Sequence, residues 1–319
     1  MKELMAMVAG MFAKRYSKRQ KTAFITYISN RAHELGQKIV IDNGYLDRRS
    51  CRNIYLGDLK HADIILAVPY DTPSKLLWRG IHYYPVNPRR NERGETIAKL
   101  LDFTLLIFLA VAYYVLVLQR FMGAGNLAKG LSYAGMLVLL FGMFRQIDGV
   151  ANRNNCVRNS SSVVVALEYF WRCSRKNTAV ALLDQSCCGF IGYRQLAQYL
   201  KASGKSKTLL AFDCIASGDE FHLHCSSKQL DFFAKAIHAD SIELHTIDEE
   251  HQEEGVFALF PKAAVLTGGC RDNGDTIICG TRCRSDDRVN LEKMERAIEL
   301  LRDIATATDG RLGGKCDEN

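Results

Sequence analysis

Two apolar runs separated by a short link decide how this chain is organised. They read FTLLIFLAVAYYVLVL (residues 103–118) and LSYAGMLVLLFGMF (residues 131–144), and residues 120–130 join them. The whole chain of 319 residues is 48% hydrophobic and 24% charged, which is ordinary for a globular protein. Against that background, the two uncharged runs indicate a hydrophobic hairpin set inside a longer sequence.

The length of the runs indicates membrane-spanning helices. The first run makes a helix of about 24 Å, and the hydrocarbon core of a bilayer is about 30 Å thick. Residues 119–122 extend the first run, and the long side chain of Lys129 extends the second by reaching toward the interface. We therefore expect a hairpin insertion at residues 98–146, with spanning helices at about residues 102–119 and 128–145. The alternative is a buried or interfacial helical hairpin.

The net charge of +7 is unevenly distributed. Residues 1–100 hold 18 Lys and Arg against 9 Asp and Glu, a balance of +9, and the rest holds 24 against 26, a balance of −2. In the link, only Arg120 and Lys129 are charged. Because positive charge gathers on the cytoplasmic side, we expect an integral membrane protein with both flanks in the cytoplasm and residues 101–145 in the lipid bilayer. No aromatic-interleaved basic patch is present, so we expect no nucleic-acid partner.

The cysteines and the first residues carry weaker signals. None of the 11 cysteines forms a C-x-x-C pair, so the sequence predicts no structural zinc framework. In the cytoplasm these thiols would be reduced. In residues 1–12 the charge of Lys2 is offset by Glu3, and the clear positive charge comes only afterwards, at Lys14, Arg15, Lys18 and Arg19. This order predicts an amphipathic helix and no cleavable signal peptide.

Both flanks alternate strands and helices. Helical periodicity covers residues 18–36, 160–171, 191–200, 228–236 and 289–305, and strands are expected at residues 38–42, 52–56, 63–68, 178–183, 208–212 and 220–225. We therefore expect one α/β domain, with a mixed central sheet flanked by helices, interrupted by the hairpin. Its two parts are residues 1–97 and 147–305, and residues 306–319 are expected to form a disordered tail. Residues 75–99 are expected to connect the first part to the membrane.

Several of these segments resemble metallopeptidase family 28, the aminopeptidase-type enzymes that use two zinc ions. The resemblance covers nearly all residues outside the hairpin. It rests on the helix ending Ala32-His33-Glu34-Leu35-Gly36, on Arg52-Asn53-Ile54-Tyr55-Leu56-Gly57 (the family's NV-x-x-x-x-G), on residues 64–73 (the H-x-D strand), on Arg158-Asn159-Ser160-Ser161-Ser162-Val163 (D-N-A-S-G-V), on residues 184–194 (D-G-E-E-x-G-L-x-G-S-R), and on Phe212-Asp213 followed by Ser217-Gly218.

In that family the motif residues hold two zinc ions, which polarise the substrate carbonyl and generate hydroxide. This chain departs from the motifs at the metal-binding positions. Pro69 stands where the family has the His of H-x-D, and Arg158, a permanent cation, stands where it has the bridging Asp. Ser186 replaces the general-base Glu and Cys187 replaces the ligand Glu.

Two acidic residues of the motifs remain. Asp213 matches a later zinc ligand, and Asp71 matches the Asp that orients the first ligand. The late His ligand has no candidate, because no histidine follows His251. The resemblance therefore implies a fold that is kept and a two-zinc site that is dismantled, with no catalytic residues and no cofactor.

Two functions follow from this pattern. The first is a membrane-anchored, catalytically inactive relative of these peptidases, with a binding, scaffolding or regulatory role. The second is a membrane-bound zinc peptidase with a rebuilt site made of Asp71, Cys187 and Asp213. His222 or His224 is a candidate for an additional ligand there, but we expect both on an edge strand facing solvent.

A nucleophilic Cys187 or Cys188 would need a neighbouring His that the sequence does not place.

The position of the hairpin adds a further expectation. It falls between the segment that resembles the H-x-D strand end and the segment that resembles the D-N-A-S-G-V helix. In the family this connection lies on the rim of the active-site cleft. We therefore expect the cleft to lie close to the membrane surface, with a membrane protein or a membrane-proximal peptide as the partner.

Overall fold

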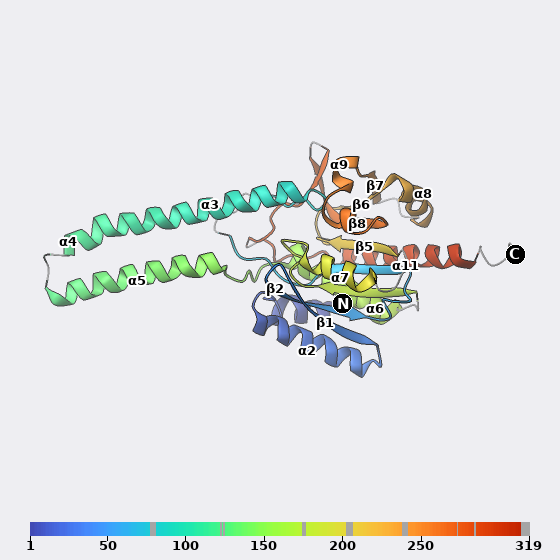
Figure 1. Ribbon diagram of the computed structural model, residues 1–319, viewed down its shortest axis with the longest axis horizontal. Helices are drawn as coiled ribbons and strands as arrows, with labels where there is room; N and C mark the ends of the chain where they lie inside the picture. The colour runs from blue at the N-terminus through green and yellow to red at the C-terminus, as the bar shows by residue number, and fades with distance from the viewer. Residues whose placement is uncertain are drawn as a thin grey trace.

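The computed structural model describes residues 1–76, 81–121, 123, 125–173, 177–201, 207–237, 242–272, 274–283 and 285–313. It consists of an α/β body from which a long helical hairpin projects (Figure 1). The α/β class with a mixed sheet and an inserted helical hairpin, as predicted from the sequence, is confirmed.

Within the described residues, nine strands form one mixed sheet. They are β1 Ile39–Leu46, β2 Arg49–Leu56, β3 Ile64–Pro69, β4 Thr178–Leu183, β5 Thr208–Asp213, β6 Glu220–Cys225, β7 Ile242–Thr246, β8 Ala263–Asp272 and β9 Asp275–Ile277. Their order is β1-β2-β4-β3-β5-β8-β6-β7, and β9 pairs with β8 outside this path. The central strands β4, β3, β5 and β8 are mutually parallel, so their carboxyl ends lie at one edge.

The body's helices cover both faces of this sheet. They are α1 Lys2–Met5, α2 Lys18–Glu34, α6 Ser161–Cys173, α7 Ile191–Lys201, α8 Ser227–Ala236, α9 Glu249–Gln252, α10 Gly255–Leu259 and α11 Leu291–Gly313, with the short π-helical segments η1 Ala6–Met11 and η3 Cys156–Ser160.

The side chains of β3 are all apolar and alternate between the two faces of the sheet, so the strand contributes to a core on each face. Ile64, Leu66 and Val68 point into one cluster with α2, α6, α8 and α11, while Ile65 and Ala67 point into the other, with α7 and α10. A strand that is apolar on both faces must be covered on both faces, and this places β3 at the centre.

The hairpin is longer than the sequence predicted. Its first arm is α3 Pro88–Tyr113, continued by η2 Tyr114–Leu118 and α4 Gln119–Phe121, and its second arm is α5 Asn126–Asp148. The amide of Arg90 donates to the side chain of Asn87 at 3.0 Å, and Pro88 follows at the first helical position. The helix therefore begins inside residues 75–99, which we expected to be only a connection.

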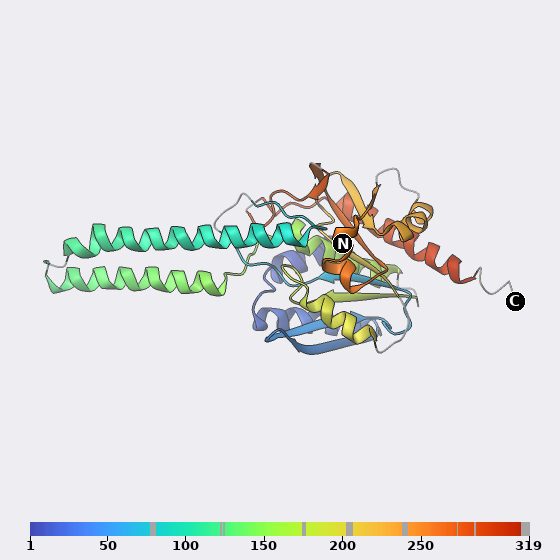
Figure 2. The same ribbon diagram turned by 45° about the horizontal axis from the view of Figure 1, so that its top comes forward.

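The two arms run side by side away from the body (Figures 1 and 2). Near the body, Nε2 of Gln146 donates to the carboxylate of Asp102 at 3.1 Å. Farther out, the Tyr113 hydroxyl donates to the Ser132 carbonyl at 3.2 Å, and a Cβ on Gly135 would lie 2.0 Å from that hydroxyl. A side chain at position 135 would therefore displace the Tyr113 hydroxyl from this contact between the arms.

Two expectations about the body are wrong. The helix α11 continues to Gly313, so the tail does not begin at residue 306; residues 314–319 lie outside the described part of the chain. The strand β6 is not an edge strand, because β8 and β7 flank it. His222 and His224 are accordingly only 1% and 5% exposed and do not face solvent.

Candidate functional site

The six positions singled out in the sequence lie at one edge of the sheet. Pro69 ends β3, Asp213 ends β5, and the loop after β4 carries Ser186 and Cys187. Because these strands are parallel, their carboxyl ends meet at the edge where α/β sheets place their sites. Arg158 reaches the same place from η3, at the start of the buried helix α6.

Arg158 is the central residue of this edge. Its Nη1 forms an ion pair with the carboxylate of Asp213, and its Nη2 donates to the Cys187 carbonyl at 2.6 Å. The guanidinium also lies over the ring of Tyr83, 3.5 Å from the ring centroid. Burial raises the pKa of Asp213, and the charge of Arg158 opposes that rise. The guanidinium thus lies against the oxygen of Asp213 that a metal ion would need.

Asp71 has a structural role in the same place. Its Oδ1 accepts the backbone N–H groups of Ser186 at 2.9 Å and of Cys187 at 3.0 Å, which fixes the loop after β4. Pro69 contributes only its carbonyl, which accepts Nδ2 of Asn159 at 2.5 Å.

Two basic residues near the N-terminus also enter this edge, and the sequence did not single them out. Arg15 is fully buried and donates to the carbonyls of Tyr70 at 2.6 Å and Val8 at 2.9 Å, and to the side chain of Asn159. Lys21 forms a buried ion pair with Asp184 at 2.5 Å. Burial lowers the pKa of Arg15 to about 10, so its side chain stays charged at neutral pH. The run of basic residues at 14–21 was the available signal.

A cavity of ≈ 840 Å³ separates the sheet edge from the base of the hairpin. From the body it is lined by Lys21, Asp71, Thr72, Gln185 and Cys188, and from the hairpin by Thr96, Lys99, Asp102, Phe103 and Gln146, among others. The hairpin therefore leaves the body at the end that carries Asp71, as its place in the sequence predicted. Of the six expected positions, Asp71 is the only one that lines this cavity within the described residues.

The residues named for a rebuilt zinc site do not fit a metal ion. In the described part of the chain, the side chains of Asp71, Cys187 and Asp213 do not bring their ligand atoms into one group. Asp213 is held by Arg158 and by the amide of Cys214 at 2.9 Å. The hydrogen bond with Cys188, together with burial, raises the pKa of the Cys187 thiol, which favours the protonated form that binds zinc poorly.

Comparisons with known proteins identify similar folds, but they do not show what chemistry this chain carries out. No family model matches the sequence, and no curated protein is similar enough to match. Among solved structures, the LapA aminopeptidase of Legionella pneumophila is similar with a TM-score of 0.53 and 11% identity, over 96% of this chain and 69% of that one. The glutaminyl cyclase of Porphyromonas gingivalis is similar with a TM-score of 0.54 and 9% identity, over 97% of this chain and 98% of that one. At such identities the likeness shows an aminopeptidase-like fold, which confirms the expected fold class.

Proposed function

We propose, from this aminopeptidase-like fold, that the protein is a membrane-anchored relative of these enzymes that does not catalyse hydrolysis. Its role would be to bind a membrane protein or a membrane-proximal peptide, in the cavity between the sheet edge and the base of the hairpin. Both parts of the body would lie on the cytoplasmic side, because the basic residues flank the apolar runs.

The position of Arg158 is the observation that supports the loss of catalysis. A two-metal mechanism needs carboxylate oxygens that are free to bind cations. Here a permanent cation already pairs with Asp213 and is held in place by the Cys187 carbonyl and the Tyr83 ring. In a protein environment, each unit of positive charge placed 4 Å from the guanidinium would be repelled by about 4 kcal/mol. A zinc ion at this carboxylate is therefore disfavoured.

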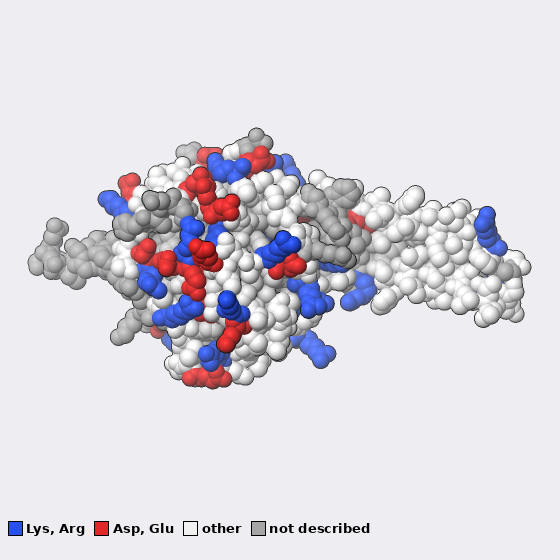
Figure 3. Space-filling view, turned by 180° about the vertical axis from the view of Figure 1, so that it is seen from behind, with Lys and Arg blue, Asp and Glu red and all other residues white. Residues whose placement is uncertain are grey.

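The exposure of the hairpin supports membrane anchoring. Its two arms contain helices long and apolar enough to cross a membrane, and only 6% of the most apolar window of each is buried. Leu105, Phe108, Leu137 and Phe141 are among the many large apolar side chains that are exposed. On the face shown in Figure 3, the outer part of the hairpin carries charged side chains only near its tip, further ones lie where it joins the body, and the body carries both signs. A soluble protein rarely exposes so large an apolar surface to water.

The place of the cavity supports a membrane-proximal partner. Its walls include Lys99, Asp102 and Phe103 at the start of the apolar part of α3, so the cavity opens next to the expected bilayer surface. The lining combines charged, amide and apolar groups, a composition that suits a peptide segment.

Hydrolysis and cyclisation assays test the loss of catalysis. The full chain, purified in detergent, should show no hydrolysis of aminoacyl-nitroanilides and no cyclisation of an N-terminal glutamine peptide above the level of a protein-free control. Activity that disappears in Asp213→Ala or Cys187→Ala would refute the proposal, and so would bound zinc that is lost in either variant.

Alkaline carbonate extraction tests the anchoring. The chain should stay in the membrane pellet after extraction and enter the supernatant only with detergent. Release by carbonate would show that the hairpin does not span the bilayer.

A further inference from the structure

A second cluster of ligating side chains lies on strands β6 and β7, away from the candidate site. These strands pair in parallel, with His222 opposite Glu243 and His224 opposite His245. Because side chains alternate along a strand, residues two apart share a face, and all four side chains lie on the same face of this strand pair. The face is opposite the one that Phe221, Leu223 and Cys225 present to the main core.

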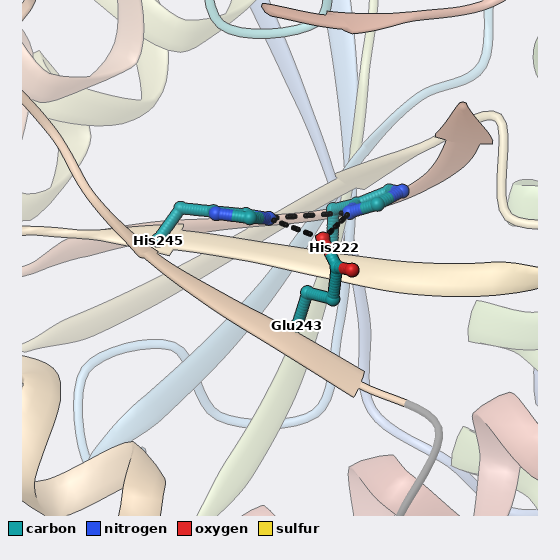
Figure 4. A group of neighbouring side chains, drawn as sticks. All are labelled: His222, Glu243 and His245. Carbon is teal, nitrogen blue, oxygen red and sulfur yellow. Dashed lines mark hydrogen bonds and ion pairs between the residues drawn. The ribbon is translucent and has the colours of Figure 1, made fainter. Parts of the chain in front are cut away.

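Three of these side chains converge on one point (Figure 4). Nδ1 of His222 lies 3.2 Å from Nε2 of His245, and Oε2 of Glu243 lies 3.3 Å from each of these nitrogens. Zinc binds nitrogen and oxygen ligands at about 2.0–2.1 Å in a tetrahedron, whose edge is then about 3.3–3.4 Å long. The triangle of ligand atoms therefore has nearly the dimensions of one face of a zinc coordination tetrahedron.

Hydrogen bonds cannot satisfy all three contacts among these atoms at once, whereas a bound cation can. A neutral imidazole nitrogen either donates or accepts, and an ionised carboxylate oxygen only accepts. Among three atoms in mutual contact, at least one pair must then be two donors or two acceptors. A single divalent cation at the centre is contacted favourably by all three atoms as lone-pair donors.

The surroundings of the cluster suit a metal ligand set. His222 is buried, and its Nδ1 is the ring nitrogen that faces both His245 and Glu243. The ring of His245 stacks on that of His224, 4.8 Å between centroids, and Nε2 of His224 contacts the Thr276 hydroxyl at 3.0 Å. Such contacts hold imidazole ligands in a fixed orientation.

One contact must change when a metal binds. Nη1 of Arg271 lies 3.4 Å from Nδ1 of His245, the nitrogen that carries the proton when Nε2 binds a metal. Arg271 is exposed, so its side chain is able to move away into solvent. Glu243 is exposed, so an ion can reach the three ligand atoms from solvent on its side.

We propose that His222, Glu243 and His245 bind a divalent transition metal, for which zinc is the best match in size and ligand preference. The two imidazoles and one carboxylate leave the fourth coordination position open to water. The metal would tie the edge strand β7 to β6. The proposal does not depend on the function proposed for the protein, because it uses different strands and none of the residues around Arg158.

Zinc binding to the full chain in detergent tests this site. Glu243→Gln and His245→Gln change the two ligands that are at least partly exposed, so the fold is expected to survive, and circular dichroism checks that it does. His61→Gln is the matched control, because His61 is exposed and far from β6 and β7 in the sheet order. We expect one zinc ion per chain by isothermal titration, with affinity reduced at least about tenfold in both ligand variants and unchanged in the control.

X-ray absorption at the zinc edge separates this site from one made by cysteines. The expected first shell contains only nitrogen and oxygen at about 2.0–2.1 Å, whereas thiolates would add sulfur at about 2.3 Å. A sulfur shell, equal affinity in all variants, or no zinc binding by the folded chain would overturn the proposal. Zinc lost in Cys187→Ala, with the His245→Gln variant unaffected, would overturn the proposed function as well.

Discussion

The guanidinium of Arg158 and the carboxylate of Asp213 form an ion pair inside the protein. Both charges are removed from water, so each depends on the other. Removal of one partner leaves an uncompensated buried charge, which costs about 3–5 kcal/mol. The pair is therefore both the obstacle to a metal ion and a condition for the stability of the sheet edge.

The first prediction concerns this pair. Arg158→Met should lower the free energy of unfolding of the full chain in detergent by about 3–5 kcal/mol, because it leaves Asp213 buried without its partner. The double variant Arg158→Met/Asp213→Leu should recover most of this loss, since it removes both charges. Urea unfolding of the single and double variants gives the coupling energy, and additive losses would show that the two residues do not depend on each other.

The second prediction concerns Arg15, which joins the N-terminal segment to the end of β3 and to α6. Arg15→Ala leaves the carbonyls of Val8, Phe12 and Tyr70 without their donor. We expect the free energy of unfolding to fall by at least about 3 kcal/mol. Lys14→Ala is the control, because Lys14 is exposed, and it should change stability by less than about 0.5 kcal/mol. Equal effects of the two substitutions would contradict the role of Arg15.

The third prediction concerns pH. Burial raises the pKa of Asp286 from 3.8 to about 7, and the carboxyl accepts the amide of Val157 at 2.7 Å. Between these two values the folded state holds a proton that the unfolded state has released. The contribution of Asp286 is thus present at low pH and is lost as the pH rises from about 4 to about 7, by at most about 1.4 kcal/mol per pH unit.

Unfolding of the wild type and Asp286→Asn across this range measures the effect. The free energy of unfolding of the wild type, minus that of Asp286→Asn, should fall as the pH rises, because the variant has no such proton to lose. Asp287→Asn, at an exposed neighbouring position, is the control and should follow the wild-type profile. A difference between wild type and Asp286→Asn that stays constant with pH would contradict the prediction.

The fourth prediction concerns the orientation of the hairpin in the membrane. A cysteine introduced as Gly125→Cys, where an added Cβ meets no atom within 4 Å, should react with a membrane-impermeant thiol reagent from the non-cytoplasmic side. The exposed native residues Cys270 and Cys279 report on the body and should react only from the cytoplasmic side. Labelling of the link and the body from the same side would contradict two spanning arms.

Much of the fold could be predicted from the sequence because apolar runs mark it directly. The buried strands β3 and β4 and the hairpin are uninterrupted apolar segments, and the structure has them where expected. The strand β8 was not predicted, and it contains Gly268 and Gly269, a residue type that is unfavourable inside strands. In the structure the strand passes through both glycines. A Cβ on Gly268 would lie 2.2 Å from the Ser217 carbonyl oxygen, so no larger residue fits at that position. Only the tertiary contact shows why glycine is required there.

The candidate site was predictable in its location but not in its contacts. The motif positions at the ends of β3 and β5 gave the location, whereas the contacts of Arg15, Lys21 and Tyr83 depend on segments far away in the sequence. The cluster on β6 and β7 was hidden for a related reason. His-x-His and Glu-x-His are visible in the sequence, but only the parallel pairing of the two strands brings Glu243 opposite His222.

The order of the strands has a consequence for how the protein is made. The strand β4 lies between β2 and β3, yet the ribosome synthesises β2 and β3 before the hairpin and β4 after it. The sheet therefore cannot close until both arms have been translated, and the first part of the body waits with unpaired strand edges meanwhile. Such edges are prone to aggregation. With the hairpin inserted in a membrane, as proposed, slow insertion would prolong this exposure of unpaired strands and would be expected to lower the yield of folded protein.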